Sequence, residues 1–297
     1  MIKTAQKLEI ISVGKELLMG KIPNVNAHWL AKRATTLGLE VDRIVTVTDD
    51  TDLISSVVRE AINRKPRFVI TTGGLGQTSD DKTLEGIAKS TGRELELNDQ
   101  ALKNIVEKFR EQKEGRKSEF TDEQFKRYKQ IMLEHERGIF SPYFLRMATI
   151  PRGSSMLLNP ILEYGGLCVI MELDDTTLIA LPGVPKQVND IFEGLIVPLF
   201  KKAAGNVKFL ETSIDVRGIG EGRLNPLMEQ VMDEHPNLYI KSNVRGDSMR
   251  EGIELYLSTT AESQSIAENC LNKALTQISQ LILEKGGKIT PIKTLTG

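Results

Sequence analysis

The residues with the clearest chemical character form a glycine-rich run that ends in two acids, Thr71 to Thr83 (TTGGLGQTSDDKT). Glycine lets a backbone turn sharply and approach a ligand closely. The N–H groups of such a loop, and of a helix that begins after it, can bind phosphate oxygens. The adjacent carboxylates of Asp80 and Asp81 could hold a hard divalent cation such as Mg²⁺. The run therefore predicts a phosphate site with a metal ion beside it.

The same residues also have a purely structural interpretation. Thr78 and Asp81 have the spacing of a capping box, and acids in a first helical turn stabilise the helix dipole without any ligand. Acids next to a phosphate site would also repel the phosphate. The residues alone leave both interpretations open, and the functional one requires a metal ion or a protonated group.

Strand-like and helical patterns alternate around this run at short intervals. The alternation predicts a parallel sheet with helices on both faces, and ligands of such folds collect at the carboxyl ends of the strands. The loops after Val13, Val47 and Thr72 should therefore converge. The predicted strands are Leu8–Val13, Val41–Val47 and Arg67–Thr72, and the predicted helices begin near Asn26, at Asp50 or Thr51, and near Ser79.

The second half of the chain predicts a change of architecture. The pattern of residues 98 to 138 predicts two charged helices joined at Gly115. Three more strands are predicted after them, the last of which ends at Leu181, with a hairpin turn at Asp174-Asp175. After Gly205 the pattern becomes a β-α-β-β-α run, which is typical of a small α+β unit. The predicted fold class is α/β, with a three-layer, mostly parallel sheet, followed by a small α+β domain. The predicted domains are residues 1–205 and 206–297.

Composition argues against several classes of protein. The 297 residues include 39 Lys+Arg and 40 Asp+Glu, a net charge of -1, whereas a general nucleic-acid binder depends on an excess of basic side chains. Cys168 and Cys270 lie far apart without a neighbouring His or Cys, which argues against a disulfide framework and a zinc finger. No apolar stretch approaches the ~18 residues that span a bilayer. We therefore expect a soluble, cytoplasmic protein.

Other polar residues follow the predicted strands. Glu16 comes just after Gly14, where the first strand stops, and would lie near the carboxyl ends of the strands as a ligand or as a helix-terminal charge. Asn24 and Asn26 could contact a ligand or cap the next helix. Asp49 follows the second strand and could contact ribose hydroxyl groups.

Several ordered motifs resemble the CinA family (competence/damage-inducible protein A). The signature GGLGxTxDDxT from Gly73 to Thr83 is similar to the loop of that family, and ISVGxELL from Ile11 to Leu18 is similar to its opening motif. Leu181 to Pro185 (LPGVP) is similar to its late loop, and Gly218 to Glu221 (GIGE) is similar to the start of its small KH-type domain. The first domain of the family is similar to the molybdopterin-binding fold of MogA, MoaB and MoeA. The resemblance therefore implies that fold for the first domain and a KH-type fold for the second.

The resemblance also implies an activity and a site. Family members often carry a C-terminal nicotinamide mononucleotide amidase, which we expect this chain to lack because it ends at Gly297. The implied activity is metal-dependent hydrolysis of the pyrophosphate bond of ADP-ribose or a related nucleoside diphosphate sugar. Asp80, Asp81 and Glu16 would be catalytic. Asp80 and Asp81 would hold the metal, either Mg²⁺ or a transition metal such as Co²⁺, with K⁺ as a further candidate. The positions expected to bind phosphate or substrate are Gly14, Asn24, Asn26, Asp49, Gly73, Gly74, Leu75, Gly76, Thr78, Pro182, Gly183, Val184 and Pro185.

Three positions depart from the family pattern. Gln77 replaces a proline of the loop, Lys15 replaces a small polar residue, and Gln187 stands where the family has glutamate. These changes leave the substrate open. One alternative is a molybdopterin-binding protein of molybdenum-cofactor biosynthesis, and another is a non-catalytic nucleotide-binding module. We expect a small-molecule nucleotide substrate, no membrane partner, no general nucleic-acid binding, and a homo-oligomer.

Overall fold

The computed structural model describes residues 5–76, 78, 80–115, 119–134, 141–158, 167–244 and 252–292. The chain divides into two compact units. The larger unit comprises Gln6–Lys32 and Glu40–Leu199, and the smaller comprises Met1–Ala5, Arg33–Leu39 and Phe200–Gly297. The domain boundary at Gly205 stays a prediction, and each unit is described by itself.

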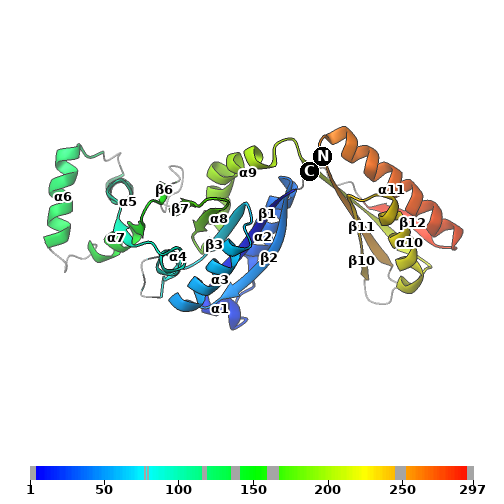
Figure 1. Cartoon of the computed structure of the whole chain (residues 1–297), viewed down its shortest axis with the longest axis horizontal. Coiled ribbons are helices and arrows are strands. Elements are labelled where there is room, and N and C mark those ends of the chain that lie inside the picture. The colour runs from blue at the N-terminus through cyan, green and yellow to red at the C-terminus, as the bar shows by residue number, and fades with distance from the viewer. Residues whose placement is uncertain are drawn as a thin grey trace. The chain divides into compact units, whose positions relative to one another are not determined.

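The larger unit contains a six-stranded sheet in the order β2-β1-β3-β8-β7-β6 (Figure 1). β1 pairs with β3 in parallel, and β3 pairs with β8 in parallel. β7 runs antiparallel to β8, as the hairpin turn at Asp174-Asp175 requires, and it also runs antiparallel to β6. The predicted mostly parallel sheet is confirmed. The strands are β1 (Gln6–Val13), β2 (Leu39–Val47), β3 (Phe68–Thr72), β6 (Ser155–Leu158), β7 (Leu167–Glu172) and β8 (Thr177–Leu181).

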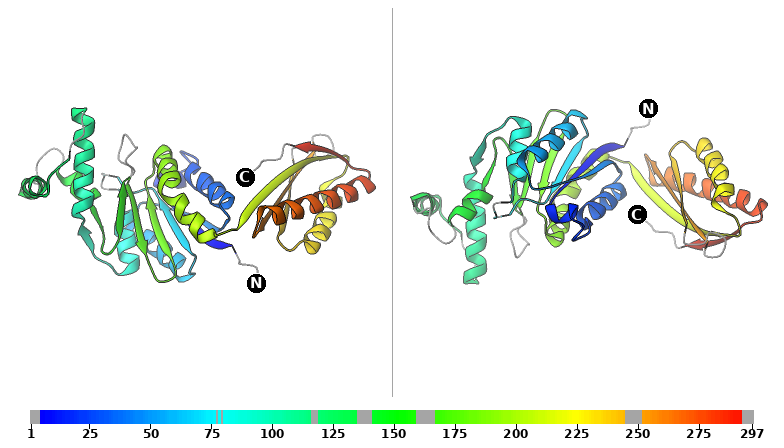
Figure 2. Two further views of the ribbon diagram at one scale, coloured as in Figure 1. Left: turned by 90° about the horizontal axis from the view of Figure 1, so that it is seen from above. Right: turned by 90° about the horizontal axis from the view of Figure 1, so that it is seen from below.

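Helices cover both faces of this sheet, because alternate strand residues are buried on each side. Figure 2 shows α2 and α8 on one face and α3 and α4 on the other. Trp29 of α2 packs edge-to-face on Phe192, with ring centroids 5.3 Å apart. On the opposite face Ile54 and Val58 of α3 join a buried cluster with Ile11 of β1. The helices are α1 (Lys15–Leu18), α2 (Val25–Thr36), α3 (Thr51–Asn63), α4 (Thr83–Thr91), α8 (Pro185–Ile191), the π-helix η1 (Phe192–Ile196) and α9 (Val197–Ala204).

A helical lobe is inserted between two short paired strands, β4 (Leu95–Leu97) and β5 (Thr149–Pro151). The lobe has its own buried cluster, which includes Leu102, Phe125 and Phe144. The predicted break at Gly115 is confirmed, since Gly115 ends the first helix with a φ of +65°. The two predicted helices are confirmed, and a third, which was not predicted, follows beyond residue 138. The helices of the lobe are α5 (Asp99–Glu114), α6 (Asp122–Glu134) and α7 (Ser141–Met147).

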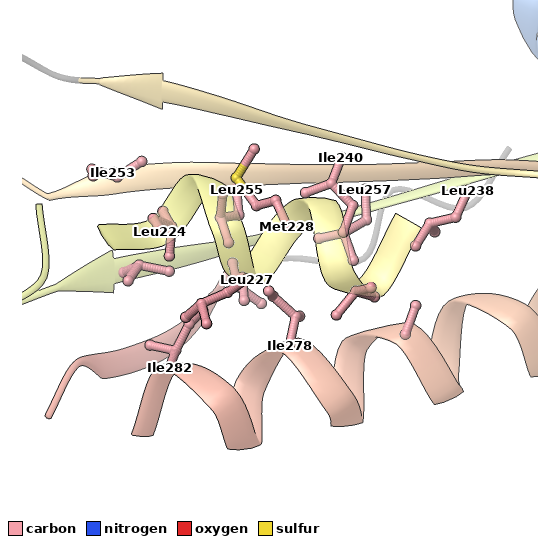
Figure 3. Close-up of a cluster of buried hydrophobic side chains, with 14 of the residues drawn as sticks. Leu224, Leu227, Met228, Leu238, Ile240, Ile253, Leu255, Leu257, Ile278 and Ile282 are labelled. Carbon is pink, nitrogen blue, oxygen red and sulfur yellow. The ribbon is translucent and has the colours of Figure 1, made fainter. Parts of the chain in front are cut away.

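The smaller unit has an antiparallel sheet in the order β10-β11-β9-β12. Figure 3 shows its core, in which Leu224 and Met228 of α10 and Ile278 of α11 pack with Leu255 of the sheet. The βαββαβ order is the split βαβ arrangement. The predicted β-α-β-β-α run lacked the last strand, and the KH-type assignment stays a prediction. The elements are β9 (Lys208–Arg217), α10 (Glu221–Glu234), β10 (Leu238–Val244), β11 (Ile253–Ala261), α11 (Gln264–Glu284) and β12 (Lys288–Ile292).

Two observations bear on the classes of protein considered above. Within the described ranges, no helix is long and apolar enough to cross a membrane. Both cysteines are free thiols. Cys168 is fully buried in β7, and its burial raises the pKa of the thiol to about 12, so this thiol stays protonated at neutral pH.

A buried ion pair joins β1 to the end of α3. Glu9 is only 1% exposed, and its two carboxylate oxygens accept hydrogen bonds of 2.7 Å from Nε and Nη2 of Arg64. The same hydrogen bonds raise the pKa of Arg64. Two parallel bonds of this kind fix the position of both groups. The pair therefore holds the strand that carries the first cavity loop against the helix beside it.

Replacing Arg64 with alanine should destabilise the protein by about 3 kcal/mol, because a buried carboxylate is left without its counter-ion. Urea unfolding measures this loss. Arg152→Ala is the matched control, since Arg152 pairs with Glu94 and Glu96 on the surface. Exposed pairs contribute little to stability, so the control should change the unfolding midpoint only slightly. Equal losses in the two variants would contradict the importance of the Glu9 pair.

Candidate functional site

A cavity of about 260 Å³ opens at the carboxyl ends of β1, β3 and β8. It is lined by residues that follow these strands and β2, so the predicted convergence of the loops after Val13, Val47 and Thr72 is confirmed. Every lining residue lies in the larger unit. Eleven of the residues singled out in the sequence line it: Glu16, Asn24, Asn26, Asp49, Gly73, Gly74, Thr78, Asp80, Asp81, Gly183 and Pro185.

The other candidate positions lie around the cavity rather than in its wall. Leu75 is buried in the core between the sheet and α3, and Val184 is 53% exposed. Gly14 lies under the carboxylate of Glu16, because a Cβ built on Gly14 would be 2.6 Å from Glu16 Oε1. Gly76 lines a second cavity, and Pro182 accepts a hydrogen bond through its carbonyl oxygen from Thr72. Gln77 lies outside the described residues.

The glycines of the loop are required because neighbouring groups leave no room for a side chain. Gly73 has a φ of +100°, and a Cβ there would lie 2.1 Å from the carbonyl oxygen of Val13. Gly74 has a φ of +64°, and a Cβ there would lie 2.3 Å from Thr83 Oγ1. Thr83 holds the loop in place, since its hydroxyl donates to the Gly73 carbonyl (2.8 Å) and its N–H donates to the Gly74 carbonyl (3.2 Å). The motif contains Thr83, but the sequence analysis assigned it no role.

Asp81 closes the loop on itself. Its Oδ2 accepts hydrogen bonds from the N–H (2.8 Å) and the hydroxyl (2.7 Å) of Thr78. The prediction that the following helix begins near Ser79 is wrong, because α4 begins at Thr83. The Thr78–Asp81 contact therefore forms before the helix rather than in its first turn, and it shapes the loop.

Three consecutive backbone N–H groups of the loop bear on its ability to bind an anion. The N–H groups of Gly74, Leu75 and Gly76 have no hydrogen-bond partner among the residues that the structure describes. Successive unpaired N–H groups in a glycine-rich turn form an anion-binding concavity. This feature supports the phosphate-binding interpretation of the loop.

The two asparagines have different surroundings. The side-chain amide of Asn24 makes its hydrogen bonds within the fold. Its nitrogen donates to Ser12 (2.9 Å) and Thr46 (3.3 Å), and its oxygen accepts from the N–H of Ala27 (3.2 Å). The amide nitrogen of Asn26 donates to the Gly183 carbonyl (2.8 Å) and to Thr72 Oγ1 (3.1 Å). The Oδ1 atom of Asn26 is buried and has no partner in the described part of the chain. Asn26 therefore offers an acceptor that a ligand could satisfy.

The cavity is lined by four carboxylates, those of Glu16, Asp49, Asp80 and Asp81, and by no Lys, Arg or His of the described ranges. Asp49 Oδ2 accepts a hydrogen bond of 2.9 Å from the N–H of Lys15, which anchors the loop after β1. The carboxylate of Glu16 accepts no hydrogen bond from a described residue. Within those residues no three His, Cys, Asp or Glu side chains gather as a metal site. The carboxylates therefore favour ligand N–H groups or a cation that arrives with the ligand.

An apolar rim adjoins this polar cavity. Ile22 and Val25 line it and remain 50% and 47% exposed. Leu18, Met19 and Val184 are also large, exposed apolar side chains on the neighbouring segments. Exposed apolar side chains next to polar residues are a common feature of binding grooves. Sequence reasoning missed this rim because single exposed apolar residues carry no pattern.

Comparison with known proteins assigns the family. A family model described as "Probable molybdopterin binding domain" matches residues 9–202, which include the whole cavity. The chain belongs to this family. A protein of Sulfurisphaera tokodaii is 36% identical over 282 residues, which cover 95% of this chain and 97% of the relative. A protein of Pyrobaculum aerophilum is 36% identical over 286 residues, covering 96% and 97%.

One similar solved structure is that of "the protein CinA with unknown function" from Thermoplasma acidophilum. It is 30% identical, with a TM-score of 0.51, and the match covers 66% of this chain and 99% of that chain. The expected α/β fold of the molybdopterin-binding type is therefore confirmed. The KH-type second domain and the missing amidase stay predictions.

Replacing Gly74 with alanine should destabilise the protein more than replacing Gly92 with alanine. Both glycines have a φ of +64°, so both substitutions carry the same cost of a left-handed backbone, about 1 kcal/mol. A Cβ at Gly92 meets nothing within 4 Å, whereas a Cβ at Gly74 meets Thr83 Oγ1 at 2.3 Å. We expect an additional loss of about 1–3 kcal/mol for Gly74→Ala in urea unfolding. Equal losses would show that the contact with Thr83 does not hold the loop.

Proposed function

We propose that the cavity binds a phosphorylated pterin of the molybdopterin type. The observation that carries the proposal is the presence, in the wall of this cavity, of the N–H group of Gly74 and of the carboxylate of Glu16, neither of which has a partner among the described residues. A phosphorylated pterin needs both kinds of partner, since one part of it donates hydrogen bonds and another part is an anion. The description of the matched family supports this choice of ligand. Molybdopterin binding, one of the functions that the sequence leaves open, is therefore the main proposal.

The aminopyrimidinone edge of a pterin presents adjacent N–H donors. An ionised carboxylate accepts two such bonds at once, and bonds to a charged acceptor are stronger than neutral ones. In this proposal the carboxylate of Glu16 accepts hydrogen bonds from that edge. The buried Oδ1 of Asn26 accepts a hydrogen bond from a further donor of the ligand. The planar ring packs on Ile22 and Val25 of the apolar rim.

A divalent cation belongs to the same proposal. Asp80 and Asp81 would hold it, with phosphate oxygens of the ligand completing its coordination, because Mg²⁺ is usually held by one or two carboxylates together with substrate phosphates. One oxygen of Asp81 already accepts two hydrogen bonds from Thr78, so the other carboxylate oxygens of Asp80 and Asp81 would coordinate the cation. When bound, the cation would offset the repulsion between the phosphate and the acids.

Metal-dependent hydrolysis of ADP-ribose is the second candidate for this cavity. The acids around a loop with free N–H donors favour it, since a metal-bound diphosphate would suit the same groups. Incubation of the protein with ADP-ribose and Mg²⁺ or Co²⁺ tests it by release of AMP. AMP release without binding of a pterin would replace the first proposal, and nucleotide binding without turnover would favour a non-catalytic module. A homo-oligomer, tested by sedimentation, stays a prediction.

Replacing Glu16 with glutamine should weaken binding of a pterin monophosphate about 10-fold or more, because bonds to a charged acceptor are worth about 1.5–3 kcal/mol. Quenching of pterin fluorescence measures the affinity. Glu16 is exposed, so the thermal midpoint should stay unchanged. Glu40→Gln, an exposed glutamate of β2 outside the cavity, is the control and should bind as the parent protein does. Unchanged affinity in Glu16→Gln would contradict the proposed role of this carboxylate.

A further inference from the structure

The glycine-rich loop also forms the wall of a second cavity. This cavity has a volume of about 340 Å³ and lies between the loop, the start of α4 and the end of α7. Gly74 and Asp81 line both cavities, so the loop separates them. The second cavity therefore borders the same three N–H donors, of Gly74, Leu75 and Gly76, that have no partner in the described chain.

Arg146 of α7 is the cation of this second cavity. Its Nη2 donates to Glu85 Oε1 at 3.2 Å, with a longer contact of 3.5 Å to the carbonyl oxygen of Asp81. Its Nε and Nη1 have no partner among the described residues, and about a third of the side chain (36%) is exposed. Of the described Lys, Arg and His residues, Arg146 alone lines either of the two cavities beside the loop.

We infer that the second cavity is an anion site, in which Arg146 binds a phosphate group. A guanidinium carries a fixed fork of donors that matches two phosphate oxygens, and two of its three nitrogens are available here. Leucine and methionine side chains, including Leu84 and Met147, line the same cavity and keep part of it apolar. An apolar lining strengthens the attraction between unlike charges, because it lowers the local dielectric constant.

The distribution of charge favours this side of the loop. The first cavity has four carboxylates and no cationic side chain from the described residues, whereas the second has Arg146 with Glu85 and Asp81. The Oδ2 atom of Asp81 is already held by Thr78. Glu85 is therefore the principal competitor of an incoming anion. The anion takes the place of Glu85 on the guanidinium, or shares it.

The phosphate group has two possible sources. It can belong to a phosphorylated pterin, whose phosphate would then lie at Arg146 instead of on a cation at Asp80 and Asp81, and this case rests on the proposed function. It can also be a free phosphate ion, and this case does not. The chemistry at Arg146 is the same in both cases, so titration with inorganic phosphate comes first.

Calorimetric titration of the full chain with inorganic phosphate tests the site. Arg146→Gln should weaken phosphate binding about 10-fold or more, because it removes the charged fork. Arg152→Gln removes a guanidinium that also pairs with glutamates but lies outside the cavity, and it should bind phosphate as the parent protein does. Glu85→Gln should tighten phosphate binding several-fold, because it removes the competing carboxylate. Arg146→Lys should bind with intermediate affinity, since it keeps the charge without the fork.

The Glu85→Gln variant separates binding from a structural role. If Arg146 only ties the lobe to α4, Glu85→Gln and Arg146→Gln would both lower the thermal midpoint and neither would change phosphate affinity. That result overturns the inference, as does unchanged phosphate binding in Arg146→Gln. A gain of affinity in Glu85→Gln cannot come from misfolding, so it supports the site even where Arg146→Gln folds poorly.

Pterins with and without a phosphate group distinguish the two sources. If the ligand supplies the phosphate, Arg146→Gln weakens binding of the phosphorylated pterin only, whereas Glu16→Gln weakens binding of both. If the phosphate is a free ion, Arg146→Gln changes the affinity for inorganic phosphate and leaves both pterins unaffected. If no pterin binds, the proposed function fails, and the titration with inorganic phosphate still decides the inference.

Discussion

The loop after β3 is fixed by two contacts that leave no room for a side chain at Gly73 or Gly74. The carbonyl oxygen of Val13 lies where a Cβ of Gly73 would be, and the hydroxyl of Thr83 lies where a Cβ of Gly74 would be. The first contact places the loop against the end of β1, and the second places it against the start of α4. The registered pairing of β1, β3 and β8 then brings the other loops to the same edge. The geometry of both cavities depends on this pair of contacts.

The position of the loop also divides the charges. Glu16, Asp49 and Asp80 lie on one side with the ends of the strands, and Arg146 lies on the other side with the start of α4. A purely anionic ligand is repelled by the first cavity, and a purely cationic ligand is repelled by Arg146. Ligand N–H groups therefore suit the first side and a phosphate group suits the second, and both preferences follow from Coulomb's law.

The features that the sequence predicts well are those determined by local patterns. The alternation of strands and helices predicts the sheet and the convergence of its loops, because strand burial and helix periodicity are visible within a few residues. The start of α4 is wrongly predicted because Asp81 bonds to Thr78, and Thr83 bonds back to the loop, instead of continuing the helix. The role of Arg146 is not predicted because its partner Glu85 lies 61 positions earlier. Short elements such as α7 and β12 have too few residues to show a period.

The helical lobe supplies Arg146 although its helices lie outside the six-stranded sheet. Its own buried cluster and the pairing of β4 with β5 give α7 a defined position, and the N–H of Asn98 donates to the carbonyl oxygen of Ala148 at the base of the lobe. The contacts of Arg146 with Glu85 and with the carbonyl oxygen of Asp81 then connect the lobe to α4 and to the loop. A group that binds Arg146 changes these contacts at the same time. Arg146 therefore connects the lobe to the loop, in addition to the contacts that β4 and β5 make with α4.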